Sequence, residues 1–308
     1  MTERQIDVTG GLAAAVTLPQ EAAVSDFVAL LKPRVMSLVV FTGFAGIVVA
    51  PGEIHPVIAA IAILCIAIAT GASGAINMWY ERDLDARMER TRTRPLPAGR
   101  MQPETALEFG VILAAGSVFV MGLGVNFAAA ALLALAIFFY VFVYTIWLKR
   151  RTPQNIVIGG AAGAFPPMIG WAAATGEVSL SSIALFAIIF FWTPPHFWSL
   201  ALYRTGDYAA AGIPMLPVVA GAPATRRQIV LYSALMLPLS LAPFALGAAG
   251  PLYAIGATAL SSIFLIGALR VWWVRSEAAA RWMFRYSILY LALLFALLAI
   301  DHALPHVV

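Results

Sequence analysis

The sequence contains a single cysteine, Cys65, and only 11% charged residues among its 308. One cysteine excludes an internal disulfide and a cysteine-based metal cluster. So small a charged fraction, together with 62% hydrophobic residues and a mean hydropathy of +0.89, excludes an ordinary soluble domain. This composition is typical of a protein that crosses a membrane many times.

Apolar runs long enough to cross a bilayer recur along the chain. A helix needs about 20 apolar residues to span roughly 30 Å of hydrocarbon. Residues 1–30 lack the pattern of a secretory signal and are predicted to be a flexible cytoplasmic N-terminal tail. Residues 31–308 are predicted to be one all-α membrane domain, a bundle of nine transmembrane helices around a central cavity. The nine spans are expected at 35–52, 56–79, 104–124, 126–148, 155–174, 180–202, 229–248, 251–273 and 284–302.

Lysine and arginine are absent from one of the two predicted membrane faces. All 19 basic residues lie before the first span or in and beside the loops that share its side. Because basic loops are retained in the cytoplasm, we expect the N-terminus there and the C-terminus on the opposite side, as nine crossings require. The expected location is the bacterial cytoplasmic (inner) membrane, with an anionic partner at its basic inner face. The other face carries Glu53, His55, Glu177, Asp301, His302 and His306.

A group of carboxylates stands at the end of the second predicted span, where stability in lipid does not require it. Asn77, Glu81 and Asp85 recur every four residues, so on a helix they share one face. We call these three residues the acidic stripe. Oxygen ligands along one stripe suit a hard divalent cation, and magnesium is the natural choice where phosphate is also bound. Asp83 lies on the other side and is expected to pair with Arg87 at i+4. A surface helix end laced with ion pairs is the alternative, but Asn77 adds polarity at depth without closing a charge pair.

Basic side chains follow these acids closely enough to bind an anion beside a metal. Arg90 and Arg94 come directly after the acidic stripe, and Lys149 and Arg150 end another span on the same side. The planar fork of arginine binds phosphate oxygens bidentately. Metals and cations that stabilise charge on a departing oxygen are what the ionisation of a diphosphate ester requires. Positive-inside topology alone is the alternative explanation for Lys149 and Arg150.

Two further residues are candidates for the same site. Asp207 is the only acid between Glu177 and Glu277. It is either a turn residue or a further metal ligand, and Arg204 beside it is a further candidate for the diphosphate. His196 lies within a span, next to a double proline and among aromatic residues. It either forms a hydrogen bond inside the bundle, handles a proton or contacts a porphyrin.

The acidic stripe and the arginines after it match a known pattern. Asn77-x-x-x-Glu81-x-x-x-Asp85, followed by Arg90-Thr91-x-x-Arg94-Pro95-Leu96, resembles the first aspartate-rich motif of the UbiA-type intramembrane prenyltransferases. Glu81 stands where that family usually has aspartate, and Asp207 stands without the second acid found in other branches. Further segments are similar to the branch that farnesylates heme, namely Lys32-Pro33-Arg34-Val35, Lys149-Arg150 with Asn155 and Gly159-Gly160, Trp192-Thr193-Pro194-Pro195-His196, and Asp207-Tyr208.

The resemblance implies that farnesyl diphosphate is bound through magnesium by Asn77, Glu81, Asp85 and Asp207, with His196 as a further catalytic residue. A vinyl group of heme B would attack the farnesyl cation, and water would quench the resulting cation to give heme O. The implied partners are these two substrates, the lipid bilayer and a downstream heme-modifying enzyme, and no nucleic acid.

Two alternatives remain at this point. One is prenyl transfer to an aromatic acid, a quinone precursor or a chlorophyllide, against which the segment around His196 argues. The other is a transporter, which would carry its polar residues near mid-bilayer in broken helices. Here the polar residues cluster at one face, which disfavours a transporter.

Overall fold

A computed structural model describes residues 22–304, and every regular element in that range is helical. The expected all-α fold is therefore confirmed. The first half contains α1 (Val24–Leu30), α2 (Pro33–Val49), α3 (Pro56–Tyr80), α4 (Arg82–Arg87), α5 (Pro103–Gly124), α6 (Phe127–Phe138), the π-helix η1 (Phe139–Leu148) and α7 (Asn155–Thr175). The second half contains α8 (Leu180–Tyr203), α9 (Thr205–Ala210), α10 (Leu216–Val219), α11 (Gly221–Ser240), α12 (Ala242–Ala245), α13 (Pro251–Val274) and α14 (Glu277–Ala303).

The predicted spans correspond to helices of the described chain. Eight segments, with η1 continuing α6 and α12 continuing α11, are long and apolar enough to cross a membrane. The helix α2 has a shorter apolar stretch, Met36–Val49, and accounts for the remaining predicted span. Two spans begin earlier than predicted, α11 at Gly221 rather than 229 and α14 at Glu277 rather than 284. In both helices a polar turn precedes the apolar run, so hydropathy alone placed the start too late.

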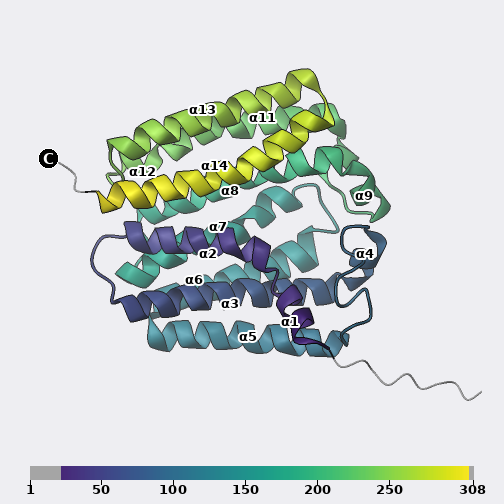
Figure 1. Ribbon diagram of the computed structural model, residues 1–308, viewed down its shortest axis with the longest axis horizontal. Coiled ribbons are helices and arrows are strands. Elements are labelled where there is room, and N and C mark those ends of the chain that lie inside the picture. Colours follow the sequence, from purple (N-terminus) through teal and green to yellow (C-terminus); the bar gives the residue numbers. More distant parts are fainter. Residues whose placement is uncertain (1–21, 305–308) are drawn as a thin grey trace, which may run out of the picture.

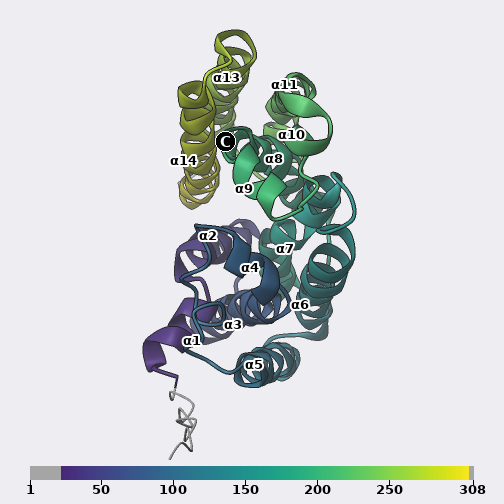
Figure 2. The same cartoon turned by 90° about the vertical axis from the view of Figure 1, so that its right-hand side faces the viewer.

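The long helices run side by side, and the segments that carry the predicted site residues lie at one end of the bundle. The short helices α4 and α9 lie at one end, while α12 and the last turns of α14 lie at the other (Figure 1). Viewed end-on, α11, α13 and α14 group with α8, and α2, α3, α5 and α6 group with α7 (Figure 2). Both acid-bearing segments, α4 and α9, are therefore at the same end, as the predicted topology requires.

The segment immediately before the first span is not simply a tail. Residues 1–21 of the predicted tail lie outside the described residues, but Val24–Leu30 form the helix α1. Asp26 on this helix is buried and accepts a hydrogen bond from Arg100 Nε at 2.9 Å. Leu30 packs in a cluster with Met78 of α3 and Leu96 of the loop after α4. The helix α1 thus packs against the loop after α4, which carries the predicted diphosphate-binding residues Arg90 and Arg94.

Close backbone approach joins α2 to α7. A Cβ atom built on Gly170 would lie well inside van der Waals contact of the Gly43 carbonyl oxygen, and one built on Gly46 would overlap the Pro167 carbonyl in the same way. Small residues permit such an approach between membrane helices. The two helices that wall the cavity described below are therefore held together by glycines at the contact.

The substitution Gly170→Ala is expected to destabilise the protein by about 1–3 kcal/mol, the usual cost of overpacking a tightly packed contact. Thermal unfolding of the detergent-solubilised protein measures this loss. Gly116→Ala on α5 is the matched control, because a Cβ there meets nothing within 4 Å. Equal unfolding temperatures for the two variants would contradict the assigned contact.

Candidate active site

The acidic stripe survives a break in the helix that carries it. The helix α3 ends at Tyr80 and α4 begins at Arg82, but the backbone bonds Glu81 N to Asn77 O and Asp85 N to Glu81 O, at 3.0 and 2.8 Å, preserve the helical spacing. Asn77, Glu81 and Asp85 are consequently buried, at 3%, 1% and 4% exposure. Asp83 is exposed, so the structure separates it from the other three as the spacing predicts.

Each member of the stripe is bound by a cation from a different part of the chain. Lys149 Nζ, at the end of η1, lies 2.5 Å from Glu81 Oε2. Arg94 donates to Asp85 Oδ2 at 2.7 Å. Lys32, just before α2, donates to Asn77 Oδ1 at 2.8 Å. Three basic segments therefore converge on one acidic stripe.

Asn77 links this cluster internally. Its amide nitrogen donates to Glu81 Oε2 at 2.8 Å and to Thr145 Oγ1 of η1 at 3.2 Å. The other oxygen of Glu81, Oε1, is buried and has no hydrogen-bond partner among the described residues. A buried carboxylate oxygen without a partner is costly, so it marks a position where a ligand would be bound.

Lys32 also belongs to the site, because it donates to Asn77, although no role for it was predicted from the sequence. Burial, then the positive charges of Arg94 and Lys149, lower the pKa of Lys32 to about 7. An arriving anion favours the charged form of such a group. In the sequence, Lys32 stood out only as part of the segment Lys32-Pro33-Arg34-Val35, which gave it no role. Its partner Asn77 is 45 residues away.

The predicted partner of Asp83 is wrong. Arg150, rather than Arg87, binds Asp83 through two hydrogen bonds of 2.8 and 3.1 Å, and its guanidinium lies 5.0 Å from the centre of the Tyr80 ring. Partial burial would raise the pKa of Asp83, but the hydrogen bonds and charge of Arg150 outweigh this and lower it. Arg150 also donates to the Tyr80 carbonyl at 3.2 Å, so it joins the end of η1 to the end of α3 and binds Asp83 rather than a member of the stripe.

Asp207 lies near this cluster but does not touch it. Its nearest cationic partner is Arg204, at 3.4 Å. The segment around Asp207 packs on α4, because Tyr208 and Met215 share a buried cluster with Leu84 and Met88. Burial raises the pKa of Tyr208, while the charges of Arg90 and Lys149 oppose the shift.

The acidic groups do not by themselves form a metal cage. Within residues 22–304, no three His, Cys, Asp or Glu side chains lie close enough together to hold a metal ion. A metal at the stripe would therefore need other oxygen ligands besides these carboxylates. Magnesium commonly binds in this way, with one or two carboxylates and the remaining ligands from substrate phosphates and water.

His196 lies apart from the acidic stripe. It is two turns before Tyr203, the last residue of α8, which at 1.5 Å per residue places it about 10 Å into the bundle. Its ring stacks between Trp192 and Phe284, with ring centres 4.4 and 4.7 Å away. Its Nδ1 lies 2.6 Å from the hydroxyl of Ser287 on α14. The structure does not bring His196 into contact with the acidic stripe.

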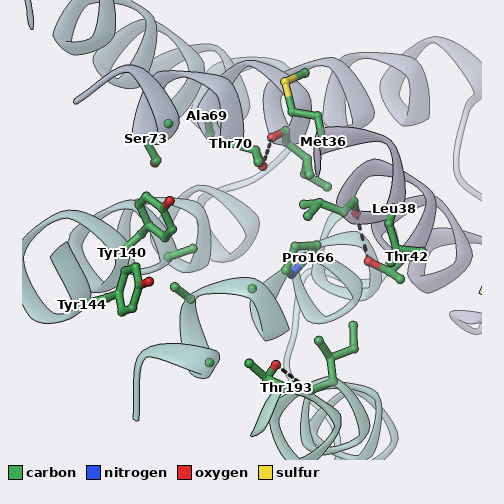
Figure 3. A pocket seen from close by; sticks show the side chains of 18 of the residues that line it. Met36, Leu38, Thr42, Ala69, Thr70, Ser73, Tyr140, Tyr144, Pro166 and Thr193 are labelled. Carbon is green, nitrogen blue, oxygen red and sulfur yellow. Dashed lines mark hydrogen bonds between the residues drawn. The ribbon is translucent and has the colours of Figure 1, made fainter. Parts of the chain in front are cut away.

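A cavity of about 280 Å³ begins beside Lys32 and extends into the bundle between α2, α3, η1, α7 and α8 (Figure 3). Most of its wall is apolar. Its polar side chains are Lys32, Thr42, Thr70, Ser73, Tyr140, Tyr144 and Thr193. The site thus joins a charged mouth to an apolar interior, which suits a ligand with an anionic head and a hydrocarbon chain.

Comparison with known proteins gives consistent results. The model of the UbiA prenyltransferase family matches residues 39–298. The chain is 61% identical over 283 residues to a protoheme IX farnesyltransferase of Parvibaculum lavamentivorans, covering 91% of this chain and 89% of that protein. It is 59% identical over 293 residues to a protoheme IX farnesyltransferase of Granulibacter bethesdensis, with 92% of each covered. A UbiA homolog from Archaeoglobus fulgidus, solved with GPP and Mg²⁺, has a similar fold, with a TM-score of 0.62, 19% identity and coverage of 89% of this chain and 99% of that one.

Proposed function

The chain belongs to the UbiA prenyltransferase family, and from that membership we propose that it transfers a farnesyl group from farnesyl diphosphate to a vinyl group of protoheme IX (heme B), forming heme O. The observation that carries this proposal is the 59% identity to the Granulibacter enzyme across 92% of the chain. The site supports it, because a diphosphate ester needs cations at its head and an apolar channel for its chain. Lys32 contacts the acidic stripe and also lines the cavity, so the two requirements meet there.

The acidic stripe fits a magnesium ion. The unpartnered Oε1 of Glu81 offers a buried anionic ligand, and Asn77 and Asp85 offer further oxygens beside it. We infer that these three residues would hold magnesium together with diphosphate oxygens, with Asp207 approaching from α9. Bound magnesium would stabilise the negative charge that develops on the leaving diphosphate.

The cations of the site have two tasks. In the structure, Lys149 is paired with Glu81 and Arg94 with Asp85. Once substrate is bound, these two side chains can turn to the diphosphate oxygens, and Arg90 and Arg204 are exposed at the same end of the bundle. Arg150 was predicted to bind the diphosphate as well, but its two bonds to Asp83 favour a structural task.

The cavity accommodates one of the two reactants. Its volume of about 280 Å³ lies just below the usual ligand-pocket range of roughly 300–1,000 Å³. An extended farnesyl chain suits this space, whereas a porphyrin needs more. His196 stacks behind Trp192, a lining residue, and does not itself line the cavity. We therefore assign His196 to the porphyrin, the reactant that this cavity does not take.

The membrane location follows from the helices, and its finer features are part of the proposal. The protein is an integral membrane protein. We place it in the bacterial cytoplasmic membrane, with residues 1–30 preceding a single transmembrane domain and the acidic stripe at the cytoplasmic face. Heme O carries a farnesyl chain and stays in the bilayer, so a downstream heme-modifying enzyme would receive it there.

The direct test is to incubate the purified protein in lipid with heme B, farnesyl diphosphate and Mg²⁺. Chromatography is expected to show heme O. Removal of divalent cations with EDTA should abolish the product, and excess Mg²⁺ should restore it, because the proposed diphosphate site depends on the metal. Prenylation of an aromatic acid or quinone precursor, with heme B left unchanged, would contradict the proposal.

A further inference from the structure

Three hydroxyl groups in the cavity wall are not used by the protein itself. Ser73 lies on α3, and Tyr140 and Tyr144 lie on η1 (Figure 3). Among the described residues, none of their hydroxyls has a hydrogen-bond partner. The neighbouring hydroxyls differ, because Thr42, Thr70 and Thr193 donate to backbone carbonyls at 2.9, 2.8 and 2.7 Å. The unpartnered hydroxyls thus form a distinct group within an otherwise apolar wall.

The position of this group is fixed by packing. Ser73 is 6% exposed, although its side chain faces the cavity. The rings of Tyr140 and Tyr144 lie 5.5 Å apart, and Figure 3 shows both hydroxyls directed into the cavity. Tyr144 rests on Gly159 of α7, where any Cβ atom would overlap its ring. The π-helical geometry of η1, a form often found at functional sites, presents both tyrosines on the same side.

Polar groups in an apolar cavity are costly unless they bind something polar. A buried water molecule typically forms about three hydrogen bonds and needs two to four polar partners. Ser73, Tyr140 and Tyr144 line the same cavity and offer three unpartnered hydroxyls, whereas the threonine hydroxyls of the wall are already bonded to backbone carbonyls. The group therefore suits one water molecule beside the hydrocarbon.

The proposed reaction consumes one water molecule. The terminal carbon of the vinyl group bonds to C1 of the farnesyl group while the C1–O bond breaks, and the diphosphate leaves with the electron pair. The remaining cation lies on the vinyl carbon attached to the porphyrin. Addition of the water oxygen gives the hydroxyl of the product, and the proton released passes to the departed diphosphate. If water does not add, loss of a proton from the neighbouring carbon gives an alkene that is lighter by one water.

Resting on the proposed function, we infer that Ser73, Tyr140 and Tyr144 hold the water molecule that becomes the product hydroxyl. These are positioning residues for water. They lie on the cavity side of the acidic stripe, since Tyr144 also stands 5.6 Å from Lys149 Nζ, measured to its ring centre. The released diphosphate, bound by Lys149 and Lys32, is thus close to the water that must lose a proton.

The test measures which product forms rather than how much. Ser73→Ala, Tyr140→Phe and Tyr144→Phe each remove one hydroxyl and keep the wall apolar. Mass spectrometry of the farnesylated porphyrin is expected to show a rise of about five- to tenfold in the ratio of alkene to hydroxylated product. This change corresponds to the free energy of one hydrogen bond. When the wild-type protein reacts in water enriched in a heavy oxygen isotope, the hydroxyl group of the product should carry the label.

Thr70→Val is the matched control. It removes a hydroxyl from the same wall, one turn from Ser73 on α3, but that hydroxyl is already bonded to the Ile66 carbonyl. Its product ratio should equal that of the wild type. An unchanged ratio in all variants that retain farnesyl transfer would overturn the inference, and loss of turnover in one variant leaves the other two to decide. A wild-type protein that forms no farnesylated porphyrin contradicts the proposed function itself, which is a different result.

Discussion

Replacing Asp85 by asparagine is expected to lower the rate of heme O formation at least about a hundredfold, the scale of losing one group that stabilises transition-state charge. Asp85 is 4% exposed and accepts a hydrogen bond from Arg94 at 2.7 Å. Asparagine keeps the size of the side chain and removes its charge. The variant therefore loses an anionic magnesium ligand and leaves Arg94 without its counter-ion.

Asp83→Asn is the matched control, because it is the same substitution two residues away. The Asp83 side chain is 52% exposed and is bonded to Arg150 outside the buried stripe. Its loss should leave turnover close to that of the wild type. The measurement is the initial rate of heme O formation at saturating substrates, with size-exclusion chromatography to show that each variant is folded. Similar rates for Asp85→Asn and Asp83→Asn would contradict the assignment of the acidic stripe as the magnesium site.

The spans and the stripe were predictable because both depend on local sequence. Uninterrupted apolar runs between charged loops identify membrane helices, and a spacing of four residues keeps Asn77, Glu81 and Asp85 on one face. The starts of α11 and α14 were missed, because Arg226 and Glu277 belong to helical turns that project beyond the apolar run. Ser276, which caps α14 through Ala279 N at 3.2 Å, was a local signal that could have placed the second start.

The partners of the stripe were not predictable from spacing. Asp83 was assigned to Arg87 on the assumption that a charged side chain pairs within its own helix, but its partner Arg150 is 67 residues away. Lys32 meets Asn77 across 45 residues, a distance that no local pattern reports. The change from α6 to the π-helix η1 was also hidden, because residues 126–148 read as one continuous apolar run. Tertiary packing decides these features.

Lys149→Met should reduce kcat/KM for farnesyl diphosphate roughly ten- to a hundredfold, since a hydrogen bond to a charged group is worth about 1.5–3 kcal/mol. The Nζ atom of Lys149 lies 2.5 Å from Glu81 Oε2. Arg151→Met removes one positive charge from the same helix end and is the matched control, because Arg151 is exposed and forms no ion pair among the described residues. Steady-state kinetics of the two variants give the comparison.

The same variant also tests the exchange of partners at Glu81. Without Lys149, the Glu81 carboxylate, with a side chain only 2% exposed, remains buried without a counter-ion. Such a loss typically costs about 3–5 kcal/mol, so the metal-free Lys149→Met protein should unfold at a lower temperature. Mg²⁺ would then supply the missing positive charge. The rise in unfolding temperature on adding Mg²⁺ should therefore be larger for Lys149→Met than for the wild type or Arg151→Met. If Mg²⁺ stabilises all three proteins equally, Glu81 does not exchange its lysine for a metal, and the roles assigned to both residues fail together.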